Sequence, residues 1–239
     1  MKLLISVANL EEASIVLKNG CDIIDIKNPK EGSLGANHPK VIKEIIKYVD
    51  GRIETSATIG DLPYLPGTSS LAGLGAATLG VDYVKAGLCG VINYEDAYTL
   101  AKWIVSAVKE YYPKTKVIIC GYGDYLSIKS VNLLFLPKIA YKVEADGVLI
   151  DLKTKSKNTN IFRYLDPSTI RKIVKEVHEY NMIFALAGGL NITHVNLLKN
   201  LNVDVMGVRR GVLHLNNWLY GSISGKKVRE LYEKVHADY

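Results

Sequence analysis

The chain has 239 residues, of which 48% are hydrophobic and 23% are charged. This length and balance are typical of a folded globular protein and exclude a disordered chain. The formal net charge is +6, but no run of five basic residues occurs, so we expect no nucleic-acid partner; attraction of anionic metabolites explains the charge equally well.

Three cysteines, Cys21, Cys89 and Cys120, occur without a CxxC motif, which indicates a reducing compartment and no disulfide framework. The opening residues, MKLLISVANLEEAS, reach acidic side chains too soon for a secretory signal. No apolar run approaches the roughly 18 residues that a membrane span needs. We therefore expect a cytoplasmic protein with no membrane partner.

A short apolar run followed by a helical stretch repeats along the chain. Asn9 and Asp166 are predicted to begin two of the helices as N-caps, with Glu12 completing a capping box after Asn9. Gly20 suits the end of the first helix. The predicted strands are 3–8, 23–27, 53–59, 83–88, 117–122, 147–152, 183–187 and 205–208, and the clearest helical segments are 9–20, 38–49, 94–112 and 166–180.

Eight strands that alternate with helices predict a parallel sheet. Eight such units in about 240 residues favour a single closed (β/α)8 TIM barrel that occupies residues 1–239. The competing architecture is an open doubly wound sheet, which would have about six strands and a glycine-rich first turn. The first turn here reads VANLEE, and no linker divides the chain.

Charged residues interrupt three of the predicted strands, although parallel strands are normally apolar on both faces. Asp25 and Lys27 share one face of the second strand, Lys85 lies in the fourth, and Asp151 lies in the sixth with Lys155 just beyond it. We expect Lys27, Lys85 and Asp151 late in their strands and inside the barrel, where barrel enzymes hold their active sites. The alternative is a set of buried ion pairs with no chemistry.

Lysine itself indicates which chemistry such a site performs. An ordinary ammonium has a pKa near 10.4, and burial or a neighbouring cation lowers it and exposes a nucleophilic amine. That amine attacks an aldehyde or ketone to give a Schiff base, which acidifies the adjacent carbon. A second lysine can move protons, and aspartates can hold the lysines. This is aldolase-type lyase chemistry.

Glycines and arginines follow the last two predicted strands, which is the usual phosphate site of such barrels. Gly188 and Gly189 would let the backbone approach a phosphate, and Arg209 or Arg210 with Gly211 would complete the site. The alternative is that the two glycines only form a turn. The five histidines show no HxH or HExxH pattern, so we expect no metal and no cofactor.

Four segments of the chain, LLISVANLEEASIVLKNGCDIIDIKNPKEGSLGA, DYVKAGL, GVLIDLKTK and ALAGGL, resemble the (5-formylfuran-3-yl)methyl phosphate synthase family of methanofuran biosynthesis, also called 4-(hydroxymethyl)-2-furancarboxaldehyde-phosphate synthase. The resemblance implies that two molecules of glyceraldehyde 3-phosphate condense with loss of phosphate and water. It also implies that Lys27 forms the Schiff base, that Lys85 accepts a proton, and that Asp25, Asp151 and Lys155 support the site.

Two other functions fit the same pattern. One is an ordinary phosphosugar aldolase or isomerase on this scaffold. The other is a non-catalytic barrel that binds a phosphorylated metabolite, although such a protein needs no pair of interior lysines. Barrel enzymes often self-associate, so a homo-oligomer stays an open alternative.

Overall fold

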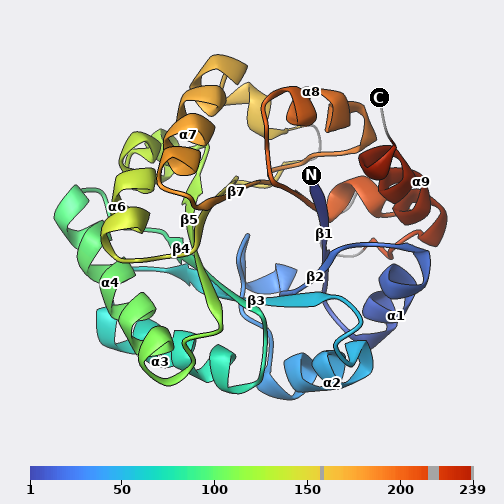
Figure 1. The fold of residues 1–239 in the computed structure, drawn as a ribbon, viewed down its shortest axis with the longest axis horizontal. Helices are drawn as coiled ribbons and strands as arrows, with labels where there is room; N and C mark the ends of the chain where they lie inside the picture. The colour runs from blue at the N-terminus through green and yellow to red at the C-terminus, as the bar shows by residue number, and fades with distance from the viewer. Residues whose placement is uncertain (157–158, 215–220, 238–239) are drawn as a thin grey trace.

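The computed structural model describes residues 1–156, 159–214 and 221–237. Figure 1 shows a central ring of strands surrounded by helices. Eight parallel strands close in chain order, and β8 returns to pair with β1. The predicted (β/α)8 barrel is therefore confirmed. The strands are β1 (Lys2–Val7), β2 (Ile23–Ile26), β3 (Glu54–Leu62), β4 (Tyr83–Leu88), β5 (Lys116–Tyr122), β6 (Gly147–Asp151), β7 (Ile183–Leu186) and β8 (Val205–Val208).

Most strand boundaries lie within one or two residues of the prediction, but the predicted end of the third strand at 59 was wrong. The pairing of β3 with β4 shifts register between Thr58 and Asp61. Gly60, with a φ of 123°, accommodates this irregularity because it lacks a Cβ. The strand therefore continues to Leu62 and carries Asp61 into the sheet.

The helices form the outer layer of the barrel (Figure 1). Both predicted N-caps are confirmed, because Asn9 accepts a hydrogen bond from Glu12 N–H at 2.9 Å and Asp166 accepts one from Thr169 N–H at 2.9 Å. The helices are α1 (Leu10–Asn19), α2 (Pro39–Val49), α3 (Pro66–Thr78), α4 (Tyr94–Tyr111), α5 (Tyr125–Ile128), α6 (Leu136–Lys142), α7 (Pro167–Glu179), α8 (Val195–Asn200) and α9 (Gly225–His236).

The predicted capping box was wrong, because the Glu12 side chain does not bond the backbone N–H of the N-cap residue Asn9. The Glu12 carboxylate accepts from the N–H of Ala8, one residue before the N-cap, at 2.7 Å. It also accepts a hydrogen bond from the Arg209 guanidinium at 2.7 Å. Glu12 therefore joins the end of β1 to the loop after β8 instead of closing the first turn of α1.

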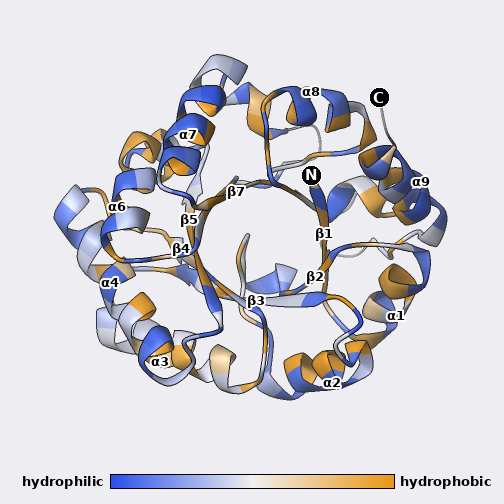
Figure 2. Ribbon diagram, in the orientation of Figure 1, coloured by the Kyte–Doolittle hydropathy of each residue, from blue (hydrophilic) through white to orange (hydrophobic). Residues whose placement is uncertain are grey.

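Alternating residues of each strand divide the core into two layers. Ile5, Ile24 and Ile119 belong to the large cluster that includes the helices, whereas their neighbours Leu4 and Ile23 belong to a separate cluster inside the ring. Figure 2 shows hydrophobic and hydrophilic residues alternating along the outer helices, as expected when one side packs on the strands. The strand residues that share the parity of Ile23 therefore face the barrel interior.

Candidate active site

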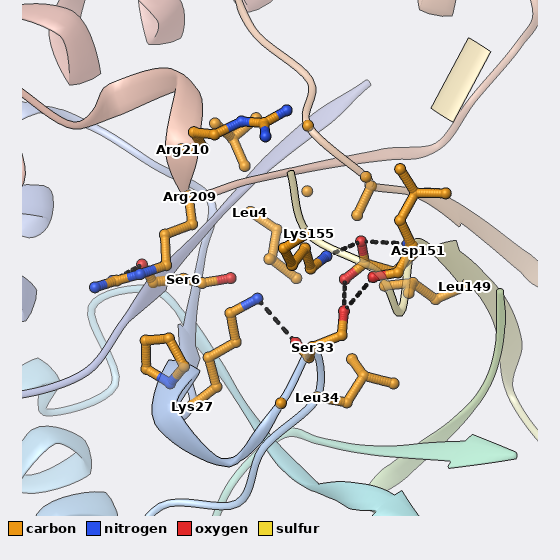
Figure 3. A pocket seen from close by; sticks show the side chains of 18 of the residues that line it. Leu4, Ser6, Lys27, Ser33, Leu34, Leu149, Asp151, Lys155, Arg209 and Arg210 are labelled. Carbon is orange, nitrogen blue, oxygen red and sulfur yellow. Dashed lines mark hydrogen bonds and ion pairs between the residues drawn. The ribbon is translucent and has the colours of Figure 1, made fainter. Parts of the chain in front are cut away.

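A cavity opens at the carboxyl ends of the strands. Asp25 and Lys27 follow the inward parity of Ile23, so both side chains point into the barrel. Figure 3 shows Lys27 and Lys155, which lie after β2 and β6, extending toward the same space. The predicted residues that line this cavity are Lys27, Lys85, Asp151, Lys155, Gly188, Gly189, Arg209 and Arg210.

Asp25 and Lys85 form a buried ion pair in the barrel interior. The Lys85 Nζ lies 2.7 Å from an Asp25 carboxylate oxygen. The hydroxyls of Ser6 and Ser56 donate to the same carboxylate at 2.8 and 2.6 Å. Burial alone would raise the pKa of Asp25, but Lys85 and Lys27 outweigh it and hold that pKa below its ordinary value.

Lys85 lies deeper in the barrel than predicted. It occupies the third of the six positions of β4, so its predicted place late in the strand was wrong. Its long side chain nevertheless lines the cavity. Lys85 therefore lies deep in the cavity and bonds Asp25, which is outside the lining, whereas Lys27 and Asp151 line the cavity at the ends of β2 and β6.

Asp151 and Lys155 form a second pair at the end of β6. The Lys155 Nζ lies 2.7 Å from one Asp151 oxygen, which also accepts from the Leu152 N–H at 2.7 Å. The Ser33 hydroxyl lies 2.8 Å from the other oxygen. Burial opposes ionisation of Asp151, but Lys155 and Lys27 outweigh burial and lower its pKa to about 2. The carboxylate is therefore charged at neutral pH.

Lys27 lies between the two pairs and bonds a backbone group. Its Nζ donates to the Ser33 carbonyl oxygen at 3.2 Å, and no carboxylate of the described residues lies within 4.0 Å of it. Burial, assisted by Lys155 and Lys85, lowers the pKa of Lys27 from 10.5 to about 8 although Asp151 and Asp25 oppose it. About one molecule in ten then carries a free amine at pH 7.

The loops after β7 and β8 present backbone to the upper cavity. Gly188 and Gly189 have φ values of 97° and 73°, and their N–H groups make no hydrogen bond within the described chain. A Cβ at Gly189 would lie 2.5 Å from the Thr159 carbonyl oxygen, so only glycine fits there. Unbonded amides beside a cavity are typical of an anion site.

The two arginines of this region have different surroundings. Arg209 is buried, bonds Glu12 at 2.7 Å and donates to the Ser6 carbonyl oxygen at 3.0 Å. Figure 3 shows its guanidinium directed away from the cavity centre. Arg210 donates to the carbonyl oxygens of Ser156 and Thr159 at the rim.

Gly211 lies outside the cavity lining, where the sequence prediction had placed it in a phosphate site. A Cβ at this position would lie 2.5 Å from the Leu190 carbonyl oxygen and 3.0 Å from the Asn191 Cα. Gly211 therefore provides close contact between the loops after β7 and β8. Its predicted contact with phosphate stays a prediction.

Two residues near Lys27 were absent from the sequence prediction. Ser33, on the loop after β2, contacts Lys27 through its carbonyl and Asp151 through its hydroxyl. The Asp61 carboxylate accepts a hydrogen bond of 2.9 Å from the Ser33 N–H of this loop. A carboxylate in a segment rich in small residues was the only sequence signal for Asp61, and a serine in a loop gives none.

The described residues contain no group of three or more His, Cys, Asp or Glu side chains able to hold a metal ion. No helix among residues 1–156, 159–214 and 221–237 is long and apolar enough to cross a bilayer.

A closed barrel with lysines and carboxylates gathered at the carboxyl ends of its strands defines a (β/α)8-barrel protein built like an enzyme. Residues 3–232 match the family described as 4-HFC-P synthase, and the chain belongs to this family. It is 44% identical to the (5-formylfuran-3-yl)methyl phosphate synthase of Archaeoglobus fulgidus, over 99% of this chain and all of that protein. The Methanosarcina barkeri synthase is 45% identical over 100% and 99% of the two chains.

Solved structures support the fold independently. The 3-hexulose-6-phosphate synthase of Salmonella typhimurium superposes with a TM-score of 0.67 at 18% identity, covering 99% of this chain and 100% of that one. At this identity the likeness concerns the fold alone. Together with the named synthases, it identifies the chain as a barrel enzyme.

Proposed function

We propose that this enzyme condenses two molecules of glyceraldehyde 3-phosphate through a Schiff base on Lys27, giving (5-formylfuran-3-yl)methyl phosphate, one phosphate and two molecules of water. The proposed pathway is methanofuran biosynthesis, and the proposed class is a carbon–oxygen lyase acting on phosphates. The observation that carries the proposal is the buried Lys27 amine, which faces the cavity and has a pKa of about 8. The names of the relatives supply the product.

The first step uses Lys27 as the nucleophile. Its free amine attacks the aldehyde carbon of one triose, and loss of the aldehyde oxygen as water leaves a protonated iminium. This new cation withdraws electrons from the adjacent carbon and favours loss of a proton there. The proposed acceptor of this proton is the neutral amine of Lys85, which lines the same cavity.

The later steps form the ring. Elimination of phosphate from the second triose gives 2-hydroxyacrolein, and the enamine carbon on Lys27 adds to its terminal carbon, which leaves the aldehyde of the second triose as the formyl group. The hydroxyl of this half then attacks the iminium carbon and closes the ring, and loss of the remaining hydroxyl as water and of the Lys27 amine aromatises the furan. Lys155, which faces the cavity beside Asp151, supplies positive charge for a departing phosphate.

The phosphate that survives fits the loops after β7 and β8. Gly188, Gly189 and Arg210 line the cavity, and the amides of the two glycines make no hydrogen bond among the described residues. We assign Arg209 an indirect part at most in phosphate binding, since its guanidinium bonds Glu12 and the Ser6 backbone.

Borohydride trapping with glyceraldehyde 3-phosphate tests the proposal. Reduction should add the mass of the reduced triose phosphate to the peptide that contains Lys27, and Lys27→Arg should abolish it, since a guanidinium forms no Schiff base. The matched control is Lys30→Arg at an exposed lysine of the same loop, which should be trapped like the parent. Trapping of Lys27→Arg at the parent rate contradicts the proposal.

Ultraviolet absorbance separates the proposal from a simpler reaction. Glyceraldehyde 3-phosphate alone should yield a conjugated furan aldehyde and one phosphate for every two trioses consumed. An ordinary aldolase or isomerase would form the Schiff base without absorbance from a furan. A non-catalytic binding protein would show neither.

A further inference from the structure

The loop between β2 and α2 carries the backbone carbonyl that contacts Lys27, and a carboxylate from β3 holds this loop. Asp61 accepts hydrogen bonds from the Ser33 N–H at 2.9 Å and the Leu34 N–H at 3.3 Å. Figure 3 shows Ser33 between Lys27 and Asp151. We propose that Asp61 is a positioning residue that fixes the Ser33–Leu34 peptide group and thereby orients the Lys27 amine; this inference rests on the proposed function.

The geometry of one peptide group connects Asp61 to Lys27. The Ser33 carbonyl and the Leu34 N–H belong to the same group, and in a trans peptide they point in opposite directions. A carboxylate that holds the N–H end therefore fixes the direction of the carbonyl end, which accepts from Lys27 at 3.2 Å. A charged acceptor on the N–H also polarises the group and strengthens its carbonyl as an acceptor.

A fixed carbonyl matters because a neutral amine has two N–H bonds and one lone pair. Donation of one N–H of Lys27 to Ser33 restricts rotation about the Cε–Nζ bond and limits where the lone pair points. Holding a nucleophile near its attack geometry accelerates bond formation without strengthening substrate binding. Loss of Asp61 should therefore slow the formation of the Schiff base and leave affinity for the triose phosphate largely unchanged.

Asp61 is itself held from several sides. Its side chain is 3% exposed, Lys153 Nζ lies 2.7 Å from one oxygen, and the Tyr122 hydroxyl donates to the other at 2.5 Å. Burial and the Asp61 charge raise the pKa of Tyr122 well above its ordinary value, so its hydroxyl stays a donor. A Cβ at Gly32 would collide with Asp61, so the loop approaches this closely only with glycine there.

The test measures the rate of trapping in single turnovers over a range of glyceraldehyde 3-phosphate concentrations. Asp61→Asn replaces one acceptor oxygen with a donor, so it cannot hold both loop amides. We expect its maximal trapping rate to fall at least about ten-fold, with the half-saturating concentration within about three-fold of the parent. Tyr122→Phe, the matched control, keeps the carboxylate and both loop amides and should stay within about three-fold in both quantities.

Several outcomes overturn the inference. Trapping of Asp61→Asn at the parent rate does so, and so does an equal loss in Tyr122→Phe, which would indicate general damage to the network. If circular dichroism shows Asp61→Asn unfolded, Gly32→Ala replaces it as the test, because its new methyl group pushes the loop away from Asp61. The maximal trapping rate of Gly32→Ala should fall while its half-saturating concentration stays near that of the parent. A maximal rate equal to that of the parent would overturn the inference. Absence of trapping in the parent contradicts the proposed function itself, a result distinct from a slow variant of a reactive parent.

Discussion

Three lysines among the described residues line the cavity, and they differ in what they bond. Lys85 and Lys155 each lie 2.7 Å from a carboxylate oxygen, whereas Lys27 donates to a backbone carbonyl. Asp25 and Asp151 are thus each paired with one of these two lysines. Lys27 is buried without a carboxylate within 4.0 Å among the described residues. Burial therefore lowers the pKa of Lys27 to about 8, which supports its proposed role as the nucleophile.

Lys27→Met should stabilise the folded protein at neutral pH. The pKa of Lys27 is about 8 in the folded protein and 10.5 ordinarily, so the unfolded chain binds the Lys27 proton more tightly. Below pH 8 this difference lowers the free energy of unfolding by about 3 kcal/mol. As pH rises from 8 to 10.5, this cost disappears. Urea unfolding of the parent and Lys27→Met should thus show a gain in the variant's unfolding free energy of up to about 3 kcal/mol at pH 7, shrinking toward pH 10.5. A less stable variant at pH 7 would contradict this.

Changes at Asp151 and Lys155 should move the pH dependence of trapping in opposite directions. Beyond burial, the Asp151 carboxylate raises the pKa of Lys27 and Lys155 lowers it. Asp151→Asn should therefore let the amine form at lower pH, and Lys155→Met should delay it to higher pH, each by about one pH unit. The midpoint of the trapping rate against pH measures the shift, whatever the maximal rate. Midpoints that move the same way would refute the assignment.

At the scale of elements, carboxylates from neighbouring strands and loops hold the loops of the site. Asp61 on β3 holds the loop after β2, and Asp124 after β5 accepts from the N–H groups of Lys153 and Thr154 after β6, at 2.9 and 2.8 Å. Glu12 at the start of α1 holds the end of β1. The loops after β2 and β6 are thus fixed by residues about 30 positions away in sequence, which gives the cavity a defined shape.

This arrangement explains which parts of the site were predictable. Asp25 and Lys27 were placed correctly from parity alone, since two residues along a strand return to the same face. Asp61 was missed because its position depends on a register shift in β3 and on contacts with Ser33, 28 residues away. No local pattern encodes such a contact. The same applies to Arg209, whose partner Glu12 lies 197 residues away.

Gly189→Ala should weaken binding of the phosphate more than the chemistry at Lys27. The new Cβ would lie 2.5 Å from the Thr159 carbonyl oxygen, and the φ of 73° disfavours any side chain. We expect the half-saturating concentration of glyceraldehyde 3-phosphate in trapping to rise about ten-fold. Trapping of unphosphorylated glyceraldehyde should change little.

The control for this variant is Gly75→Ala in α3, where a Cβ meets open space. It should leave both half-saturating concentrations unchanged, and the helix should gain up to about 1 kcal/mol. An equal loss of affinity for both aldehydes in Gly189→Ala would show that these glycines shape the whole cavity instead of binding phosphate.

At the scale of the whole molecule, the two core layers separate stability from chemistry. The layer between strands and helices contains most of the large buried side chains, while the layer inside the ring lies beneath the ion pairs. The repeated apolar runs predicted the outer layer, because each strand and helix must bury a face. A substitution in the outer layer should therefore change the unfolding free energy and leave the site intact.

Phe184→Ala tests this separation. Phe184 lies in β7, is fully buried and belongs to the outer layer. Its truncation should lower the unfolding free energy by about 3 to 5 kcal/mol, while the midpoint of trapping against pH stays at the parent value in the folded protein. Phe135→Ala, at a phenylalanine that is 44% exposed and packs edge-on against Tyr94, should cost about 1 kcal/mol. A midpoint that moves in Phe184→Ala would show that packing outside the ring sets the reactivity of Lys27.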